Sequence, residues 1–315
     1  MTQDSCIIDG KDISTLGMFI LRGGDYDFLS FPERKEPASV NWWERSGIDA
    51  DLSDVYFKEK KVVVRFYVAA SDADEYLYRL DAFNDLISRP GERTLYSREF
   101  GRTFRLRYIG SPALIHKGGL YKPAKKRGEI GVEFSMDDPL QIIDDRTILI
   151  PTGMRTSASR VSLNGVDLSQ FGIIVNECYN TALKLPGAKQ PLTRVFDRRT
   201  GLIAYAPGIR SFETKQIVVE CTMVAPSREE FYHNYQALFN NIALPGGLML
   251  ETYNGSEKCY YAAMQGFKKL RPFSVRAMVS FSLVFIVVDT ALPDYLLSTE
   301  DGNFVITQDE FLIKI

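Results

Sequence analysis

The clearest pattern along the chain is an alternation of apolar and polar positions in two separate segments. The segments 62–70 (VVVRFYVAA) and 217–225 (IVVECTMVA) carry apolar residues at every second position and are rich in β-branched side chains. A period of two with this composition is typical of strands. Each segment is therefore predicted to be a strand with one buried face.

A helical pattern follows each of these strands. Ser71 with Asp74, and Ser227 with Glu230, have the spacing of a capping box at the start of a helix. Apolar residues then recur at intervals of three or four positions, which predicts an amphipathic helix. A proline–glycine pair ends each helix, because proline cannot continue the helical hydrogen-bond ladder. The apolar positions are Tyr76, Leu80, Phe83 and Ile87 in the first helix and Phe231, Tyr235, Leu238 and Ile242 in the second.

Shorter β-prone runs complete each half of the chain. An Asp-Gly or Asn-Gly pair near the start of each half favours an opening hairpin, since both residues tolerate positive φ. We therefore expect a mainly β protein with two similar domains. Each would be an antiparallel sandwich or partly closed barrel with one helix packed against it. The later strands are predicted at 93–96, 103–109 and 128–136 in the first half and at 248–253, 258–265 and 275–288 in the second.

These patterns belong to a long internal repeat. The segments 8–20 (IDGKDISTLGMFI) and 163–175 (LNGVDLSQFGIIV) share a Gly-x-Asp-x-Ser-x-x-Gly spacing and lie 155 positions apart. The two strong strands and the two proline–glycine pairs have the same offset. A period of this length predicts two similar domains rather than a solenoid. Further pairs fit offsets of 156 and 147: Gly110 with Gly266, and Phe134-Ser135 with Phe281-Ser282.

The repeat divides the chain into two domains and a terminal segment. We place the first domain at 1–147 and the second at 148–292, with the boundary in a stretch of Pro, Gly, Ser and Arg that lacks apolar periodicity. Residues 293–315 leave the repeat and carry an Asp-Gly turn between two β-prone runs. They form either a small hairpin or an arm that pairs with a neighbouring subunit.

Composition places the chain among folded proteins and narrows its function. The 315 residues are 45% hydrophobic and 25% charged, which excludes a disordered chain. Lys and Arg number 38 against 40 Asp and Glu, so the strong positive charge typical of nucleic-acid-binding proteins is absent. No apolar run approaches the ~20 residues of a membrane helix, and the N-terminus lacks a signal-peptide pattern. We expect synthesis and folding in a cytoplasm.

The sequence shows no constellation of residues that indicates catalysis. A nucleophile elbow, a phosphate-binding loop and a dinucleotide fingerprint are all missing. The two histidines and four scattered cysteines lack the spacing of a metal site or a disulfide framework, which predicts buried, reduced thiols. Asp137-Asp138 with 144–145 does not match a calcium loop. We therefore expect no enzyme activity, no metal and no cofactor.

Two segments are candidate contact sites. The basic run 117–127 (KGGLYKPAKKR) is interpreted either as an exposed hairpin loop or as a loop that touches a neighbouring subunit, and not as a nucleic-acid site. The only tryptophans are adjacent, and neighbours on an extended chain point to opposite faces. We expect one ring to be packed and the other to be available to a partner. The candidate contact residues are Trp42, Trp43, Lys117, Tyr121, Lys122, Lys125, Lys126 and Arg127.

The order of these features resembles the tube-type domain of phage distal tail proteins. The landmarks are an opening turn, a long connection with arginine and glycine, a strong strand, one helix that ends at Pro-Gly, and a closing Asp-Pro. Together they cover most of both halves. In this chain they are Asp9-Gly10, Arg45-Ser46-Gly47, Pro90-Gly91 and Asp138-Pro139, then Asn164-Gly165, Arg198-Arg199-Thr200-Gly201 and Pro245-Gly246.

The resemblance implies a structural virion protein, assembled in the host bacterial cytoplasm. Such a protein forms a ring at the distal end of a phage tail, continues the tail tube and anchors adsorption or baseplate proteins. Distal tail proteins pair one tube-type domain with a different second domain, whereas tandem tube-type domains resemble trimeric hub proteins. Rings of six chains and of three chains therefore both stay open. The implied partners are further copies of the chain and other tail proteins, without membrane insertion.

Two other functions also stay open. A carbohydrate-binding β-sandwich would use aromatic residues as sugar platforms, and Trp42, Trp43, Tyr260 and Tyr261 are available in the sequence. An adaptor of a contractile injection machine would share the same domain type as a tail protein. A sugar-binding module is expected to be monomeric and to bind glycans, whereas a tail protein is expected to form a ring.

Overall fold

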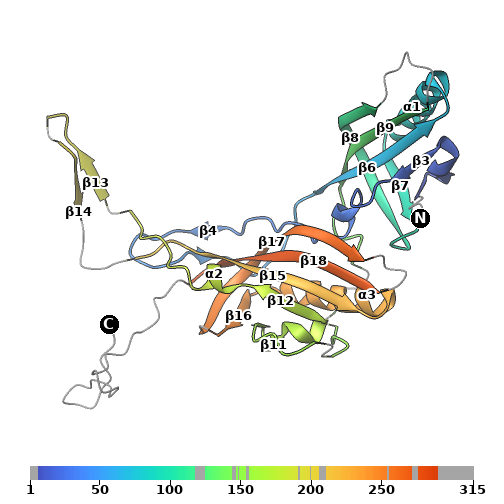
Figure 1. Cartoon of the computed structure of the whole chain (residues 1–315). Coiled ribbons are helices and arrows are strands. Elements are labelled where there is room, and N and C mark those ends of the chain that lie inside the picture. The colour runs from blue at the N-terminus through green and yellow to red at the C-terminus, as the bar shows by residue number, and fades with distance from the viewer. Residues whose placement is uncertain are drawn as a thin grey trace, which may run out of the picture.

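The computed structural model describes residues 6–117, 125–143, 147, 149–153, 156–190, 192–198, 200–205, 211–253, 255–271 and 276–289. Across these residues the chain is mainly β, as predicted, with two large antiparallel sheets and two small hairpins (Figure 1). The predicted terminal segment 293–315 lies outside the described residues. No helix of the described part is long and apolar enough to cross a membrane.

Both large sheets have the same order of corresponding strands. In each, the strong strand that periodicity predicts lies near one edge, and the opening hairpin forms the other edge. The first sheet runs β2 (Lys11–Asp12), β1 (Cys6–Ile8), β7 (Glu92–Ser97), β8 (Arg102–Lys117), β9 (Lys126–Met136), β6 (Lys60–Ala70) and β3 (Met18–Ile20). The second runs β11 (Val166–Asp167), β10 (Ser162–Leu163), β16 (Leu248–Thr252), β17 (Gly255–Arg271), β18 (Ala277–Val287), β15 (Gln216–Ala225) and β12 (Ile173–Glu177).

The shared motif near the start of each half builds a short capped turn. In the first half, the Asp12 carboxylate accepts a hydrogen bond from the Ser14 amide at 2.9 Å and begins the 3-10 helix η1 (Ile13–Leu16). Gly17 ends this helix in the left-handed conformation. The helix η3 (Leu168–Phe171) repeats the arrangement, with Asp167 as its cap and Gly172 at its end. The repeated Asp and Gly are therefore explained by backbone geometry.

The two predicted helices are present, and one of the two caps differs from the prediction. Helix α3 (Arg228–Ile242) begins as expected, with Ser227 Oγ accepting from the Glu230 amide at 3.1 Å. Helix α1 (Ala73–Ile87) is capped by Asp72, which accepts from the Glu75 amide at 2.8 Å, and not by Ser71. Asp72 also lies 155 positions before Ser227, so the cap follows the repeat. The short α2 (Tyr179–Ala182) is a second helix in the second half, too brief for periodicity to predict.

The strand register corrects two of the sequence pairings. Phe134 lies opposite Val62, and Phe285 lies opposite Ile217, so Phe134 corresponds to Phe285 and not to Phe281. The predicted pairing was four residues out of register. An even shift keeps every side chain on its own face of the sheet, so the alternating pattern cannot detect it.

A β-bulge gives the second correction. Tyr108 and Gly110 flank a register shift in β8, and Tyr261 and Ala263 flank the corresponding shift in β17. Gly110 therefore corresponds to Ala263, and Gly266 lies in a later bulge of β17. A bulge inserts a residue without a signal in the period-two pattern, so the two glycines could not establish which positions of β8 and β17 correspond.

Each long connection carries a small hairpin that the sequence did not predict. We call residues 28–58 the first arm and 182–213 the second arm. The first contains β4 (Ser39–Val40) and β5 (Asp49–Ala50), and the second contains β13 (Leu192–Val195) and β14 (Leu202–Tyr205). The stems of the two arms match, because an isolated antiparallel β-bridge joins Arg34 to Phe57 in the first and Ala188 to Phe212 in the second. In Figure 1 the β13–β14 hairpin projects away from both sheets.

Buried side chains from both halves form one apolar cluster. Helix α1 packs on β6 and β9 of the first sheet, and α3 packs on β15 of the second. The pairing of each large sheet ends at an edge strand, so its described strands form an open sheet and not a closed barrel. The division into domains 1–147 and 148–292 stays a prediction.

Candidate interaction surfaces

The first arm lies on the second half of the same chain. The Phe31 ring packs against Tyr235 and Phe239 of α3, with centroids 4.2 Å and 4.9 Å apart. The carbonyl of Leu29 accepts a hydrogen bond from the Tyr235 hydroxyl. Leu29 and Phe31 are 1% and 3% exposed. The arm is therefore anchored by apolar side chains in a pocket made by the opposite half.

The same arm continues along the open edge of β17. The Arg34 amide donates to the Ala262 carbonyl at 2.8 Å, and the Tyr261 hydroxyl donates to the Pro32 carbonyl at 3.0 Å. The Arg34 guanidinium lies over the Tyr260 ring, 5.2 Å from its centroid. Burial lowers the pKa of Arg34. Because β16 pairs only with the first residues of β17, this part of β17 is free to receive the arm.

The hairpin at the end of the first arm is held by one lysine of the second arm. Lys189 Nζ donates to the carbonyls of Trp42, Arg45 and Gly47 at 2.6 Å, 2.6 Å and 2.7 Å. The Gly47 amide donates to the Phe212 carbonyl at 2.8 Å. A lysine ammonium has three N–H donors, and here each meets one carbonyl. The tip of the first arm is thus docked on the stem of the second.

A buried polar contact also joins the two halves. Lys269 Nζ lies 3.1 Å from the Glu99 carboxylate and 3.9 Å from that of Asp25. The Tyr232 hydroxyl of α3 donates to the Phe100 carbonyl at 2.9 Å. The second half therefore contacts both the first arm and the β7–β8 turn of the first sheet.

The two tryptophans are both exposed, so the prediction that one would be packed is wrong. Trp42 is 49% exposed and Trp43 is 43% exposed. They lie where the chain leaves β4 and enters a turn, and not on an extended strand. Alternation of side chains between two faces therefore does not apply to them. Their role as partner contacts stays a prediction.

The basic run connects two neighbouring antiparallel strands. Lys117 ends β8 and pairs with Arg127 of β9, and its ammonium lies 2.5 Å from the Glu129 carboxylate. Lys125 and Arg127 are exposed, whereas Lys126 is buried. Three of the predicted contact residues in this run, Lys117, Lys125 and Arg127, thus present their side chains at the surface. Tyr121 and Lys122 lie outside the described residues.

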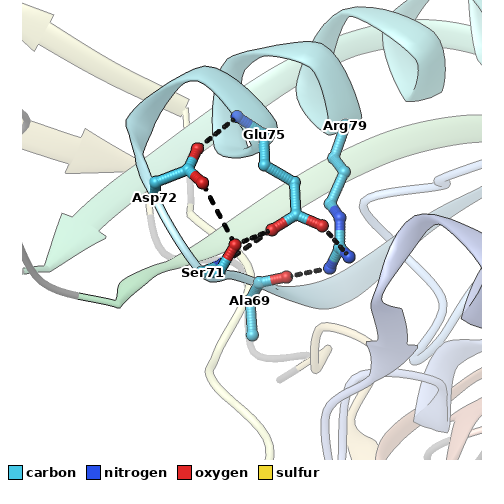
Figure 2. A network of polar contacts seen from close by, with 5 residues as sticks. All are labelled: Ala69, Ser71, Asp72, Glu75 and Arg79. Carbon is cyan, nitrogen blue, oxygen red and sulfur yellow. Dashed lines mark hydrogen bonds and ion pairs between the residues drawn. The ribbon is translucent and has the colours of Figure 1, made fainter.

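A groove beside this run is lined by the start of α1. Figure 2 shows the polar network at this helix start. Glu75 is its central acidic group: the Ser71 amide donates to its carboxylate at 2.7 Å, and Arg79 contacts it at 2.5 Å. Arg79 also donates to the carbonyl of Ala69. The hydrogen bonds from Ser71 lower the pKa of Glu75. These groups saturate one another, so the network fixes the strand-to-helix turn.

The described side chains of the metal-ligating types are scattered. No cluster of three or more His, Cys, Asp or Glu that could hold a metal ion occurs among those residues. The four cysteines are buried and unpaired, and burial raises the pKa of Cys259 to about 12. His233 Nε2 contacts the Ile150 carbonyl at 2.8 Å. The buried cysteine thiols are poor nucleophiles because they stay protonated.

The aromatic residues proposed as sugar platforms divide into two groups. Tyr260 and Tyr261 are 7% and 1% exposed because the first arm covers them. Only the tryptophans remain accessible.

The arm anchors Leu29, Phe31 and Arg34 were missed by sequence reasoning, although the apolar residues in DFLSFPERK were a visible signal.

Comparisons with known proteins give a structural likeness but no sequence match. No protein-family model matches the chain, and no curated protein matches its sequence. The solved structures include the SPP1 Dit protein, described as a paradigm of the hub adsorption apparatus in phages that infect Gram-positive bacteria. The two chains are 11% identical, with 90% of this chain and 98% of that chain covered, and the TM-score is 0.33. A score at this level leaves the function to be argued from the chain's own residues.

Proposed function

We propose that this chain is a structural, non-catalytic protein of a phage tail, which forms a ring at the distal end of the tail tube and anchors adsorption or baseplate proteins. The family resemblance supplies the biological setting, and the docking of the first arm on the second half carries the proposal. In that docking, the arm of the first half contacts the sheet edge and the helix of the second half. A repeated contact of this head-to-tail kind generates a ring when its rotation closes.

The charge of the chain supports a passage for DNA. A formal net charge of −2 leaves little excess of cations to hold phosphate groups. DNA that must slide through a ring is retarded by lysine and arginine contacts, so a near-neutral lining favours release. A strongly basic lumen in the assembled ring would contradict this part of the proposal.

The mass of the protein in solution tests the proposal. Light scattering on a sizing column is expected to give three or six times 35.7 kDa, and negative-stain microscopy is expected to show a central hole. The mass also decides between three and six chains. A protein that stays monomeric at all concentrations and binds specifically to a glycan array would overturn the ring and favour a carbohydrate-binding module.

A further inference from the structure

The two arms carry apolar residues at the same stem positions, but only those of the first arm are buried. The matched stems place Arg34 and Ala188 at equivalent positions, 154 apart. By this offset Leu29 and Phe31 correspond to Leu183 and Leu185. The first pair is buried on the second half, whereas Leu183 and Leu185 are 59% and 63% exposed. Two large exposed leucines at anchor positions indicate a missing receptor surface.

The tips of the arms match as well. Trp42 and Phe196 are equivalent aromatic residues, and both are exposed. Gly47 and Gly201 both adopt a left-handed backbone, with φ of 76° and 84°. In the first arm this tip meets Lys189 of the second stem. The β13–β14 hairpin of the second arm projects away from both sheets (Figure 1).

The first half carries the receptor surface that the second arm lacks. Helix α3 is buried on nearly all sides because the first half covers it, whereas α1 is buried on one face only. Tyr232, which contacts the first half, corresponds to Leu77 of α1, and Leu77 is 46% exposed. The helix that corresponds to the arm-binding helix therefore presents an uncovered apolar face.

The sheet edge shows the same difference. Ala262, which receives the Arg34 amide, is the extra residue of a bulge in β17, and Ile109 is the extra residue of the matching bulge in β8. Ile109 is 42% exposed, and Leu114 further along β8 is 59% exposed. The paired part of β7 ends before this stretch. Here β8 offers an unpaired edge to an incoming strand.

The stem of the first arm completes the receptor. The Lys35 amide donates to the Tyr56 carbonyl at 2.8 Å, as the Lys189 amide does to the Ser211 carbonyl at 2.9 Å. Lys35 is therefore the equivalent of Lys189, and its side chain is exposed. A hairpin tip that presents carbonyls to Lys35 would reproduce the contact that Lys189 makes with the first arm.

We propose that the second arm docks on the first half of another copy of this chain. Leu183 and Leu185 would take the places of Leu29 and Phe31, against α1 and the outer part of β8, and Lys35 would hold the arm tip. The occupant is a second copy because donor and receptor are both present, uncovered, on one chain. This inference rests on the proposed ring and names the contact between its subunits. Each chain would supply its two halves to two successive positions around the ring.

A mixed cross-link tests the contact directly. Phe31 packs on Phe239, so Leu185 is expected to lie near Asn84, the equivalent of Phe239, in another copy. Chains with Leu185→Cys are mixed with chains with Asn84→Cys and treated with a short bifunctional maleimide. The native thiols are buried, so only the introduced ones are accessible. We expect a covalent dimer in the mixture and none with either variant alone.

A surface charge provides the second test. Leu185→Glu is expected to break the assembly into monomers of 35.7 kDa. Tyr253→Glu, at a position that is 82% exposed and outside both arms, is expected to leave the assembly intact. Both variants are expected to keep the wild-type circular dichroism spectrum. A wild-type ring that survives Leu185→Glu and gives no mixed cross-link overturns this contact but keeps the ring. A wild-type protein that is monomeric and gives no cross-link overturns both.

Discussion

The Lys269 ammonium lies 3.1 Å from the Glu99 carboxylate, although Lys269 belongs to β17 of the second half and Glu99 to the β7–β8 turn of the first. Asp25 approaches the same ammonium to 3.9 Å, and the three side chains are 8%, 12% and 2% exposed. Removal of one partner from a buried ion pair leaves the other charge without compensation. The relative position of the two halves is thus fixed by charge as well as by apolar packing.

Lys269→Met is expected to lower the free energy of unfolding by about 3–5 kcal/mol, because two buried carboxylates lose a neighbouring positive charge. Urea denaturation followed by circular dichroism measures the change. Lys268→Met is the matched control, since Lys268 is exposed and adjacent in sequence, and its effect is expected to stay within about 0.5 kcal/mol. Equal losses in both variants would contradict a role for the buried pair.

Lys189→Met is expected to release the tip of the first arm. The variant loses three hydrogen bonds from a charged ammonium to backbone carbonyls. Hydrogen bonds to a charged group contribute about 1.5–3 kcal/mol each. Cleavage after Arg45 by an arginine-specific protease should therefore become at least roughly tenfold faster. The exposed Lys184→Met is the control. An unchanged rate of cleavage in Lys189→Met would show that the tip is held by other contacts.

Two glycines with nearly the same φ separate backbone strain from steric contact. Gly172 has φ of 73°, and a Cβ there would lie 2.6 Å from the Val224 carbonyl oxygen. Gly165 has φ of 78° and open space around it. Gly165→Ala is expected to cost about 1–2 kcal/mol from strain alone. Gly172→Ala adds a clash with the backbone and should lower the free energy of unfolding by about 2–5 kcal/mol, measured by chemical denaturation. Similar losses in the two variants would contradict the clash.

Burial of Lys60 predicts a pH dependence of stability. Its ammonium is enclosed near the carbonyls of Phe28 and Ser30, and burial lowers its pKa from 10.5 to about 7. As pH rises above about 7, the folded state loses this proton while the unfolded state keeps it. The unfolding free energy should therefore rise with pH in this window.

The measurement for Lys60 is a series of urea denaturations between about pH 7 and 8.5, below the ordinary pKa of thiols. At higher pH the buried cysteines act in the opposite direction, because burial raises their pKa. Lys60→Met should flatten the rise, and the exposed Lys61→Met should retain it. A wild-type stability that does not change with pH in this range would contradict the lowered pKa.

Local chemistry made much of the fold predictable. The alternation in 62–70 and 217–225 located β6 and β15, and Asp9-Gly10 located a hairpin because its backbone needs positive φ at both residues. The registers of β9 and β18 were not determined, since an even slip preserves the pattern. The arms were missed because the residues that bury Phe31 lie more than 200 positions away in sequence. Lys126 was taken as a surface cation, but its place in β9 buries it.

The first arm also has a consequence for synthesis. The Phe31 amide and the Met264 sulfur that it contacts are separated by 233 positions. A ribosome adds ~5–20 residues per second, so about 10–50 s pass between the emergence of the arm and that of its receptor. During this interval Leu29 and Phe31 of the nascent chain face water. A finished second half on a neighbouring ribosome of the same message offers the same pocket, so exchange of arms between nascent chains competes with closure within one chain.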